Sequence, residues 1–402
     1  MSGLARSRRL LPALCALAGI ALIAGCSSGA AHGHATATAA SPPGSGQGTL
    51  HLVVPPGPVQ NGNVDPRIDW ATPFEKQTGC TVVLKNANSD AEAVHYLTAP
   101  GFSYDGVLAS PEEAGQLIGA RAVTPLNTRL IAGYQALSSR LRNAPGDASG
   151  GRAYGLPYVW DSYVAGFRPG AVKPPPRGWD ALFSPATARR YAGKITLPDS
   201  PVTLALAALA LKSARPSLGI TDPFELTRTQ FAAVVAAVDA VRGDVGTFWT
   251  QDSSVIGQLG DGQDVLGGVL RHQIDALAQA GLPADSVPSL ADATPSVPVV
   301  GDVDSWLVSA KDANAGCMYR WLSWSASKTV QREVSAWTGE APADPAACTG
   351  GAVGACRQFR EADLAFARNI VFEHLPSASC GNGRTGCVPY AQWQTAWDRT
   401  AG

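Results

Sequence analysis

The sequence predicts an α/β fold, built around a parallel sheet, in an exported chain. Short β-branched and apolar runs at 49–54, 81–84 and 106–109 alternate with helical patterns near 68–77 and 91–97. Strands that alternate with helices at this spacing indicate βαβ units and a parallel sheet. Of the 402 residues, 45% are hydrophobic and 16% charged, so the chain can bury a sizeable core.

The N-terminus has the layout of an export signal. Three arginines precede an apolar run at 10–25 that ends in small residues before Cys26. This order is typical of a bacterial lipoprotein signal, so we expect residues 1–25 to be removed and Cys26 to be lipidated. The run is shorter than the roughly 20 residues that cross a bilayer. A lipid anchor would hold the protein on the extracytoplasmic face of the cell membrane.

Residues 26–48 are rich in Ser, Gly, Ala, Thr and Pro, which predicts a disordered tether. Six cysteines remain beyond it, and an even number in an exported chain predicts disulfides. Separation along the chain favours two local pairs and leaves one long-range pair, namely Cys348–Cys356, Cys380–Cys387 and Cys80–Cys317. No CxxC motif or nearby histidine favours a metal site instead, and we expect neither a metal nor a cofactor.

Charge and motifs exclude several functions. The net charge is −1, and no basic run follows the signal, so nucleic acid is not an expected partner. The chain carries no GxSxG, HExxH or P-loop motif. We therefore expect no enzyme, although an exported hydrolase that uses carboxylates stays open as an alternative. We also expect a monomer.

Further elements follow in order along the chain. Two long extended runs, at 154–167 and 297–308, predict strands that cross between two parts of the fold. A capping pair, Thr227 with Gln230, predicts the start of a long helix. The other expected elements are strands at 194–197 and 265–270 and helices at 202–212, 318–324 and 330–337.

Acidic and aromatic side chains collect at the predicted strand ends. Ligands bind beyond the carboxyl ends of parallel strands, which places 55–60 and 110–112 at a candidate site. A small cation would want carboxylates for charge-assisted hydrogen bonds and an indole face beside its charge. The ordinary alternative for each residue is a helix cap, a solvated loop or the core. The candidates are Glu112, Trp160, Asp161, Asp199, Asp302, Asp304 and Trp306.

Several segments in order along the chain resemble the spermidine/putrescine-binding proteins of bacterial ABC importers, most closely lipid-anchored actinobacterial members. The likeness covers roughly 49–402 and depends on the order and spacing of its segments. These are Phe74 to Cys80, Tyr104 to Val107, Tyr154 to Trp160, Asp304 to Trp306, Gly316 to Trp321 and Gly339 to Pro342.

The resemblance implies the type II periplasmic-binding-protein fold, with two α/β lobes joined by crossing strands. The first lobe would comprise 49–156 and 298–402, including a cysteine-stapled C-terminal segment, and the second lobe 157–297. In that family the lobes close around a solute and deliver it to membrane permease subunits. The expected partners are therefore a small solute, with a polyamine leading, and an ABC permease.

The resemblance also implies site residues. Trp160 and Asp304 match family positions near the cleft, and Ser110 matches the serine that ends the third strand. Two departures concern the ligand: Asp302 stands where an aromatic residue is common, and Arg271 stands in a region where relatives often carry tryptophan. With fewer aromatic rings, the site would hold the methylene chain of a polyamine less tightly. An anionic or zwitterionic solute anchored by Arg271 therefore stays open as an alternative.

Overall fold

The computed structural model describes residues 48–288, 297–359, 368–380 and 385–401. The predicted signal peptide, the tether and the lipidation site at Cys26 lie outside these residues. Among the described residues, no helix combines the length and the apolar character that a membrane span requires.

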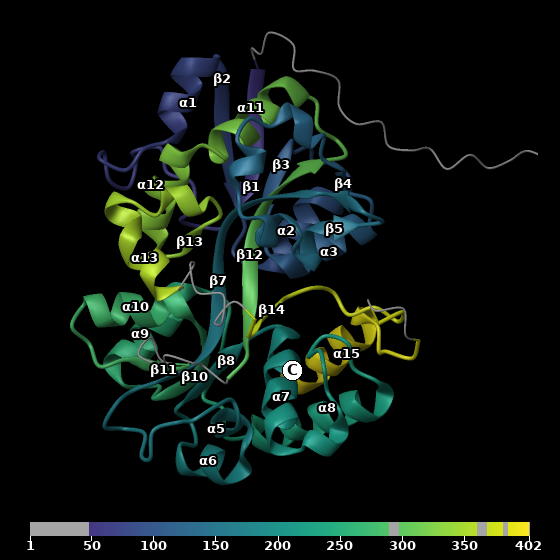
Figure 1. Cartoon of the computed structure of the whole chain (residues 1–402), viewed down its shortest axis with the longest axis vertical. Helices are drawn as coiled ribbons and strands as arrows, with labels where there is room; N and C mark the ends of the chain where they lie inside the picture. The colour runs from purple at the N-terminus through teal and green to yellow at the C-terminus, as the bar shows by residue number, and fades with distance from the viewer. Residues whose placement is uncertain (1–47, 289–296, 360–367, 381–384, 402) are drawn as a thin grey trace, which may run out of the picture. The chain divides into compact units, whose positions relative to one another are not determined.

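Strands and helices alternate along the chain as predicted (Figure 1). The first part comprises β1 (Gly48–Val54), α1 (Ala71–Thr78), β2 (Cys80–Asn86), α2 (Asp90–Thr98), β3 (Gly106–Ala109), α3 (Pro111–Gly119), β4 (Val123–Thr124), α4 (Ser139–Arg142), β5 (Ala148–Ser149), β6 (Arg152–Ala153) and β7 (Gly155–Phe167). The middle part comprises α5 (Asp180–Phe183), α6 (Pro185–Arg190), β8 (Ile195–Pro198), α7 (Val202–Ala214), α8 (Arg228–Arg242), β9 (Thr247–Trp249), α9 (Asp252–Asp261), β10 (Leu266–Leu270), α10 (Arg271–Gln279) and β11 (Asp285–Val287). The last part comprises β12 (Val299–Ser309), α11 (Ala315–Ser325), α12 (Lys328–Thr338), β13 (Ala341–Pro342), α13 (Val353–Gln358), β14 (Ile370–Phe372) and α15 (Tyr390–Ala401).

One sheet connects the strands in the order β2-β1-β3-β12-β7-β10-β8-β9. The strands β2, β1 and β3 are parallel to one another, and so are β10, β8 and β9. Between these groups, the long strands β12 and β7 run antiparallel to each other and to their outer neighbours. Figure 1 shows the two side by side. The predicted α/β class and both crossing strands are confirmed.

The helices that follow β2 and β3 begin with side-chain caps. The Ser89 side chain accepts a hydrogen bond at the start of α2, and Ser110 forms a capping box with Glu113 at the start of α3. These caps fix where each helix begins. They therefore hold Asp90, Glu112 and Glu113 in first turns at the carboxyl ends of the strands, where the sequence predicted a site.

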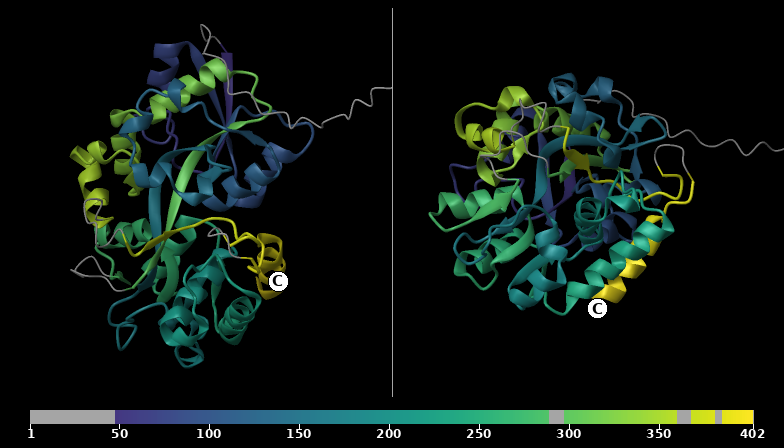
Figure 2. Two further views of the ribbon diagram at one scale, coloured as in Figure 1. Left: turned by 45° about the vertical axis from the view of Figure 1, so that its right-hand side comes forward. Right: turned by 60° about the horizontal axis from the view of Figure 1, so that its bottom comes forward.

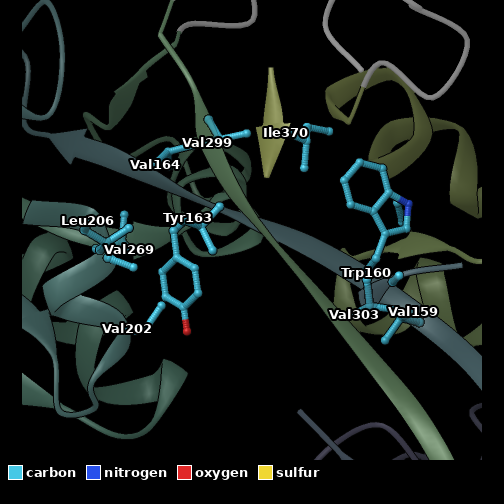
Figure 3. Close-up of a cluster of buried hydrophobic side chains, with 14 of the residues drawn as sticks. Val159, Trp160, Tyr163, Val164, Val202, Leu206, Val269, Val299, Val303 and Ile370 are labelled. Atoms are coloured by element: carbon cyan, nitrogen blue, oxygen red, sulfur yellow. The ribbon is translucent and has the colours of Figure 1, made fainter. Parts of the chain in front are cut away.

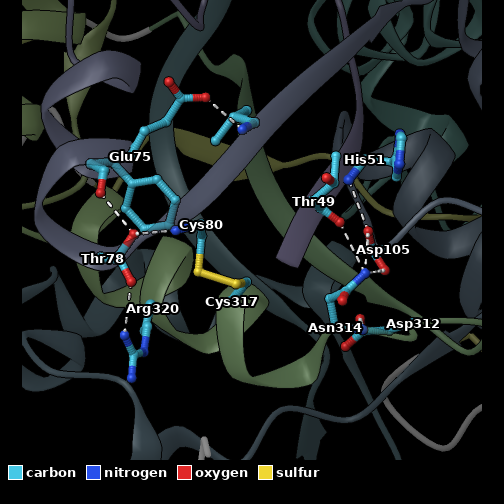
Figure 4. Close-up of a disulfide and its surroundings, with 12 residues drawn as sticks. Thr49, His51, Glu75, Thr78, Cys80, Asp105, Asp312, Asn314, Cys317 and Arg320 are labelled. Carbon is cyan, nitrogen blue, oxygen red and sulfur yellow. Dashed lines mark hydrogen bonds between the residues drawn. A yellow bond between two sulfur atoms is a disulfide. The ribbon is translucent and has the colours of Figure 1, made fainter. Parts of the chain in front are cut away.

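All three predicted disulfides are confirmed: Cys80–Cys317, Cys348–Cys356 and Cys380–Cys387. The first joins residues 237 positions apart and ties β2 to α11 (Figure 4). In the same region, the Asn314 side chain donates a hydrogen bond to the carbonyl oxygen of Thr49, at 2.9 Å. The long-range bridge therefore fastens the first strands to the segment that follows β12.

The C-terminal helix α15 packs against α8 (Figure 2, right). The Trp393 ring lies 5.3 Å from Phe231 and 6.4 Å from Phe224, measured between centroids. The sequence assigned 298–402 to the first lobe, yet α15 lies on an element of the 157–297 segment. This packing buries Trp393, which is 1% exposed, and burial of a large aromatic side chain stabilises the fold.

Candidate ligand-binding site

Six carboxylates gather where α2, α3, β12 and β14 come together, and we name them the acid cluster. Burial raises the pKa of all six, and repulsion from another member raises it further for every member except Asp90. Ser110 bonds to both Asp90 and Glu113, and the pairing of β12 with β14 sets Asp302 and Asp304 near Glu373. The members are Asp90, Glu112, Glu113, Asp302, Asp304 and Glu373.

The strand β12 supplies Asp302 and Asp304. Side chains two positions apart share one face of a strand, and both carboxylates are half-buried, while Val303 between them is buried. Burial raises the pKa of each carboxyl group well above its usual range. Repulsion from Asp304 raises the pKa of Asp302 further, and repulsion from Glu340 raises that of Asp304 further. The Oδ1 atom of Asp302 has no hydrogen-bond partner in the described chain.

The first turn of α3 supplies Glu112, which is 7% exposed. The Tyr390 hydroxyl lies 2.6 Å from its Oε1 atom, and the Ser200 hydroxyl donates to Oε2 at 3.2 Å. Burial and then Asp90 raise the pKa of Glu112 to about 7, although the hydrogen bonds from Tyr390 and Ser200 lower it. Glu112 therefore joins α3 to two segments that are distant in sequence.

Neighbouring backbone positions place the remaining members. The Ser110 hydroxyl donates to Oδ2 of Asp90 at 3.0 Å, and the Ser110 backbone N–H donates to Oε2 of Glu113 at 2.8 Å. Glu373 directly follows β14, and its N–H donates to the carbonyl oxygen of Gly301 at 2.9 Å. That bond sets Glu373 beside the Asp302 position of β12.

The acid cluster has no cationic partner among the described residues. The ion pairs found in this part of the chain involve Arg67, Arg332 and His272, and none of them reaches the acid cluster. Burying several carboxylates without a counter-charge is costly. The protein can reduce that cost by protonating the acids or by binding a cation, and a site with this composition would reject anions.

Tyr163 on β7 lies beside the acid cluster. Burial raises its pKa well above the usual range, followed by repulsion from Asp302 and Glu373. Figure 3 shows its ring near Val202 and Val269. Tyr163 therefore brings an aromatic ring, with apolar side chains around it, to the edge of a strongly acidic region.

The structure places both predicted tryptophans in the hydrophobic core. Trp160 is 3% exposed and meets Phe359 edge to face, with centroids 5.1 Å apart (Figure 3). Trp306 is fully buried between Trp321 and Tyr158, at 5.5 and 5.7 Å. Both indoles are therefore buried and pack against other aromatic rings.

Asp161 and Arg271 have their hydrogen-bond partners outside the acid cluster, although Asp161 lies opposite Asp302 in the pairing of β7 with β12 and raises the pKa of Asp302. Asp161 accepts a hydrogen bond from the Arg271 backbone N–H at 3.1 Å and lies 2.5 Å from Nδ1 of His272. The Arg271 guanidinium is buried and donates to the carbonyl oxygen of Pro288 at 2.7 Å. Asp161 thus caps the start of α10, as the ordinary alternative for a strand-end acid predicted.

The remaining candidate, Asp199, is exposed and accepts a hydrogen bond from the Trp397 indole N–H at 3.1 Å. It helps to hold α15, and its neighbour Ser200 is the residue that reaches Glu112. Of the nine predicted residues, the structure brings three into the acid cluster and places Ser110 in contact with it. Those three are Glu112, Asp302 and Asp304.

Two groups of described residues combine a histidine with carboxylates, with one ligand atom from each residue within 4.8 Å of the others. The first group comprises Asp161, His272 and Glu340, in which Nδ1 of His272 bonds to Asp161, while Nε2 lies 3.3 Å from Asp252 outside the group. Burial lowers the pKa of His272, but the nearby carboxylates outweigh this and raise it well above its usual value. An imidazolium held in this way is an ion-pair partner and not a metal ligand. The second group comprises Asp222, Glu225 and His374.

Sequence reasoning missed Asp90, Glu113, Glu373, Tyr163 and Tyr390. Asp90 and Glu113 lie in first turns after parallel strands, so the strand-end rule that selected Glu112 could have found them. No local signal marks Glu373 or Tyr390. They reach the site only because β14 pairs with β12 and α15 packs on α8, and both contacts are long-range.

The family can now be stated. The model of the bacterial extracellular solute-binding protein family matches residues 69–353, more than half of the chain, and the chain belongs to this family. Its members and solved relatives are substrate-binding proteins of transport systems. The description of this family, extracellular solute-binding proteins, is consistent with a binding site for a small solute.

Two curated relatives come from Pseudomonas aeruginosa. A putrescine/cadaverine-binding protein is 27% identical over 175 residues, which cover 41% of this chain and 46% of that protein. The putrescine-binding periplasmic protein SpuD is 26% identical over 148 residues, which cover 35% of this chain and 40% of that protein. The matched part thus spans less than half the length of either relative.

A solved structure supports the fold over a longer range. The spermidine/putrescine ABC transporter substrate-binding protein PotD from Streptococcus pneumoniae superimposes with a TM-score of 0.64 at 15% identity. The match covers 89% of this chain and 100% of that one. The predicted type II periplasmic-binding-protein fold is confirmed.

Proposed function

We propose that this protein is the receptor of an ABC importer for a cationic solute, with polyamines such as putrescine and spermidine as the leading class. The observation that carries the proposal is the acid cluster, whose six carboxylates have no cationic partner in the described chain. A diamine or triamine supplies two or more ammonium groups on a flexible stem. It can therefore offset several carboxylates at once.

The neighbouring residues suit the rest of such a molecule. Each ammonium donates charge-assisted hydrogen bonds, which stabilise by about 1.5–3 kcal/mol apiece. Tyr163 offers a ring to the methylene stem or to an ammonium, and it lies beside Asp302. Both Pseudomonas relatives are named for binding putrescine, and one of them also for cadaverine, and both amines are cations of this kind.

The two alternatives have weaker support. An anionic solute anchored by Arg271 would have to approach a guanidinium that is 2% exposed and bound to the Pro288 carbonyl. A hydrolase would need a nucleophile or activated water beside its carboxylates. We propose instead that the protein binds its solute and releases it unchanged to a permease.

The proposal also includes the anchoring and movement of the protein. Lipidation at Cys26 would hold it, as a monomer, at the extracytoplasmic face of the membrane. Two lobes would close on the solute about the β7 and β12 crossings, with 49–156 and 298–359 in the first and 157–297 in the second. The helix α15 would move with the second lobe, because it packs on α8.

A thermal-shift panel tests this function. Putrescine and spermidine should raise the unfolding midpoint, because a ligand at about 100 times its Kd adds about 2.7 kcal/mol of apparent stability. Succinate and γ-aminobutyrate are the matched anionic and zwitterionic probes, and they should have little effect. Stabilisation by succinate alone would contradict the proposal, and consumption of the amine would favour an enzyme.

A further inference from the structure

The hydrogen bonds around Tyr390 do not balance when Glu112 is ionised. The Tyr390 hydroxyl oxygen lies 2.6 Å from Oε1 of Glu112 and 2.7 Å from Oε1 of Gln394. Nε2 of Gln116 donates to this hydroxyl oxygen at 3.2 Å and to Oε1 of Glu112 at 3.4 Å. A hydroxyl carries one hydrogen, so Tyr390 can donate to only one of its two oxygen neighbours. The other short contact then lacks a proton.

The orientation of Gln394 does not remove the problem. Its Nε2 atom donates to Oδ1 of Asp398 at 2.7 Å. An ionised carboxylate only accepts hydrogen bonds, so the amide nitrogen faces Asp398 and the amide oxygen faces Tyr390. A flipped amide would set two acceptors against each other at Asp398. Gln394 therefore cannot supply the missing proton.

A protonated Glu112 completes the network. Its carboxyl O–H donates to Tyr390, the Tyr390 O–H donates to Gln394, and Gln394 donates to Asp398, so each short contact contains one hydrogen. The chain of donors then runs in a single direction from α3 into α15. In this arrangement every short contact among the four side chains is a hydrogen bond.

The surroundings of Glu112 favour its neutral form. The titratable groups that face it are three carboxylates, Tyr390 from α15 and Tyr163 from β7, and the described chain places no lysine, arginine or histidine among them. Burial raises the pKa of Glu112 to about 7 in agreement with the proton count. The carboxylates are Asp90 on α2, Glu113 on α3 and Glu373 after β14.

We propose that Glu112 carries a proton in the solute-free receptor and exchanges it for an ammonium group of the solute, with Tyr390 as the positioning residue. On binding, the Glu112 O–H bond breaks and its proton leaves to solvent, while the carboxylate pairs with the ammonium. The Tyr390 hydroxyl turns from Gln394 to the new carboxylate. This inference depends on the proposed function, because the exchange requires a cationic solute.

Exchange of this kind links binding to pH and to the C-terminal helix. Affinity should rise with pH until Glu112 is ionised before binding, since protons and ammonium groups compete for the same carboxylate. The turn of Tyr390 breaks its bond to Gln394, so α15 contacts the site differently in the two states. The C-terminal segment is therefore part of the binding machinery.

Calorimetry with putrescine near pH 7, in two buffers of different ionisation enthalpy, counts the protons released. The wild type should release protons, and Glu112→Gln, which keeps the shape but cannot exchange, should release up to about one fewer per solute. Tyr390→Phe removes a donor to the ionised form, so its release should shift to higher pH. Thr395→Val removes an exposed hydroxyl from the same helix and should behave as the wild type.

Infrared difference spectroscopy tests the solute-free state independently. The wild type should show a protonated carboxylic-acid band that disappears in Glu112→Gln and on addition of putrescine. If putrescine binds, the wild type and Glu112→Gln release equal numbers of protons, and the band is absent, then the exchange is wrong while the proposed function stands. A Glu112 band without binding of any amine would instead contradict the proposed function, and with it the exchange.

Discussion

At the scale of single residues, the site is defined by carboxylates that have no cationic partner in the described chain. Asp302 and Asp304 are half-buried on one face of β12. Asp304 raises the pKa values of Glu113, Asp302 and Glu373, and Asp302 raises that of Tyr163, and no basic side chain neutralises either. Members of the acid cluster accept hydrogen bonds from neutral donors, such as Ser110 and Ser200, but none has a cation beside it as Asp161 has in His272. The acid cluster is therefore incomplete without a cation.

Asp304→Asn should weaken the binding of putrescine by about tenfold or more, because it removes one charge-assisted contact while keeping the shape of the side chain. Calorimetry at pH 8 measures the change. Asp261→Asn, an exposed position at the end of α9, is the matched control and should leave the affinity unchanged. Equal affinity in Asp304→Asn and the wild type would remove Asp304 from the site.

At the scale of elements, local sequence patterns predicted the strands and helices well. The run at 106–109 matches β3 and the capping pair at Thr227 opens α8, because β-branched runs and side-chain caps act locally. The strand-end rule found Glu112 after β3, whereas Asp302 and Asp304, which the sequence also placed at a strand end, lie inside the long strand β12.

Long-range packing accounts for what sequence patterns could not supply. Both tryptophans were assigned to the site, yet Trp306 lies between aromatic rings that are distant in sequence. Nothing near Tyr390 indicates that α15 returns to α3. Whether a tryptophan side chain lies in the core, and whether a C-terminal tyrosine reaches a binding site, depends on contacts with residues that are distant in sequence.

The disulfides should differ in their effect on stability. Removing Cys80–Cys317, which are 237 residues apart, with serine at both positions should lower the unfolding free energy by about 5 kcal/mol in the chain-entropy account. Removing Cys348–Cys356, 8 residues apart, should cost about 2.5 kcal/mol on the same basis. Urea denaturation measures both, and an equal cost for the two bridges would contradict this prediction.

At the scale of the whole molecule, the buried acids should make the solute-free protein less stable as pH rises. The pKa values of Glu112 and Asp147 are both raised to about 7, chiefly by burial, while unfolded acids titrate near pH 4. Between these values the folded state holds more protons than the unfolded state. The unfolding free energy therefore falls as pH rises from about 5 to 8.

Denaturation at a series of pH values checks this dependence. Saturating putrescine should reduce the loss of stability at high pH, because the ammonium groups offset the ionised carboxylates. A solute-free protein that is most stable near pH 8 would show that the buried acids are already compensated in the fold.

The most direct test of the central claim is isothermal titration calorimetry of the full-length protein with putrescine and spermidine at pH 8. The acid cluster predicts saturable binding of one amine per protein, which weakens in Asp304→Asn and is absent with succinate. Saturable binding of succinate, with no heat from either amine, would contradict the account.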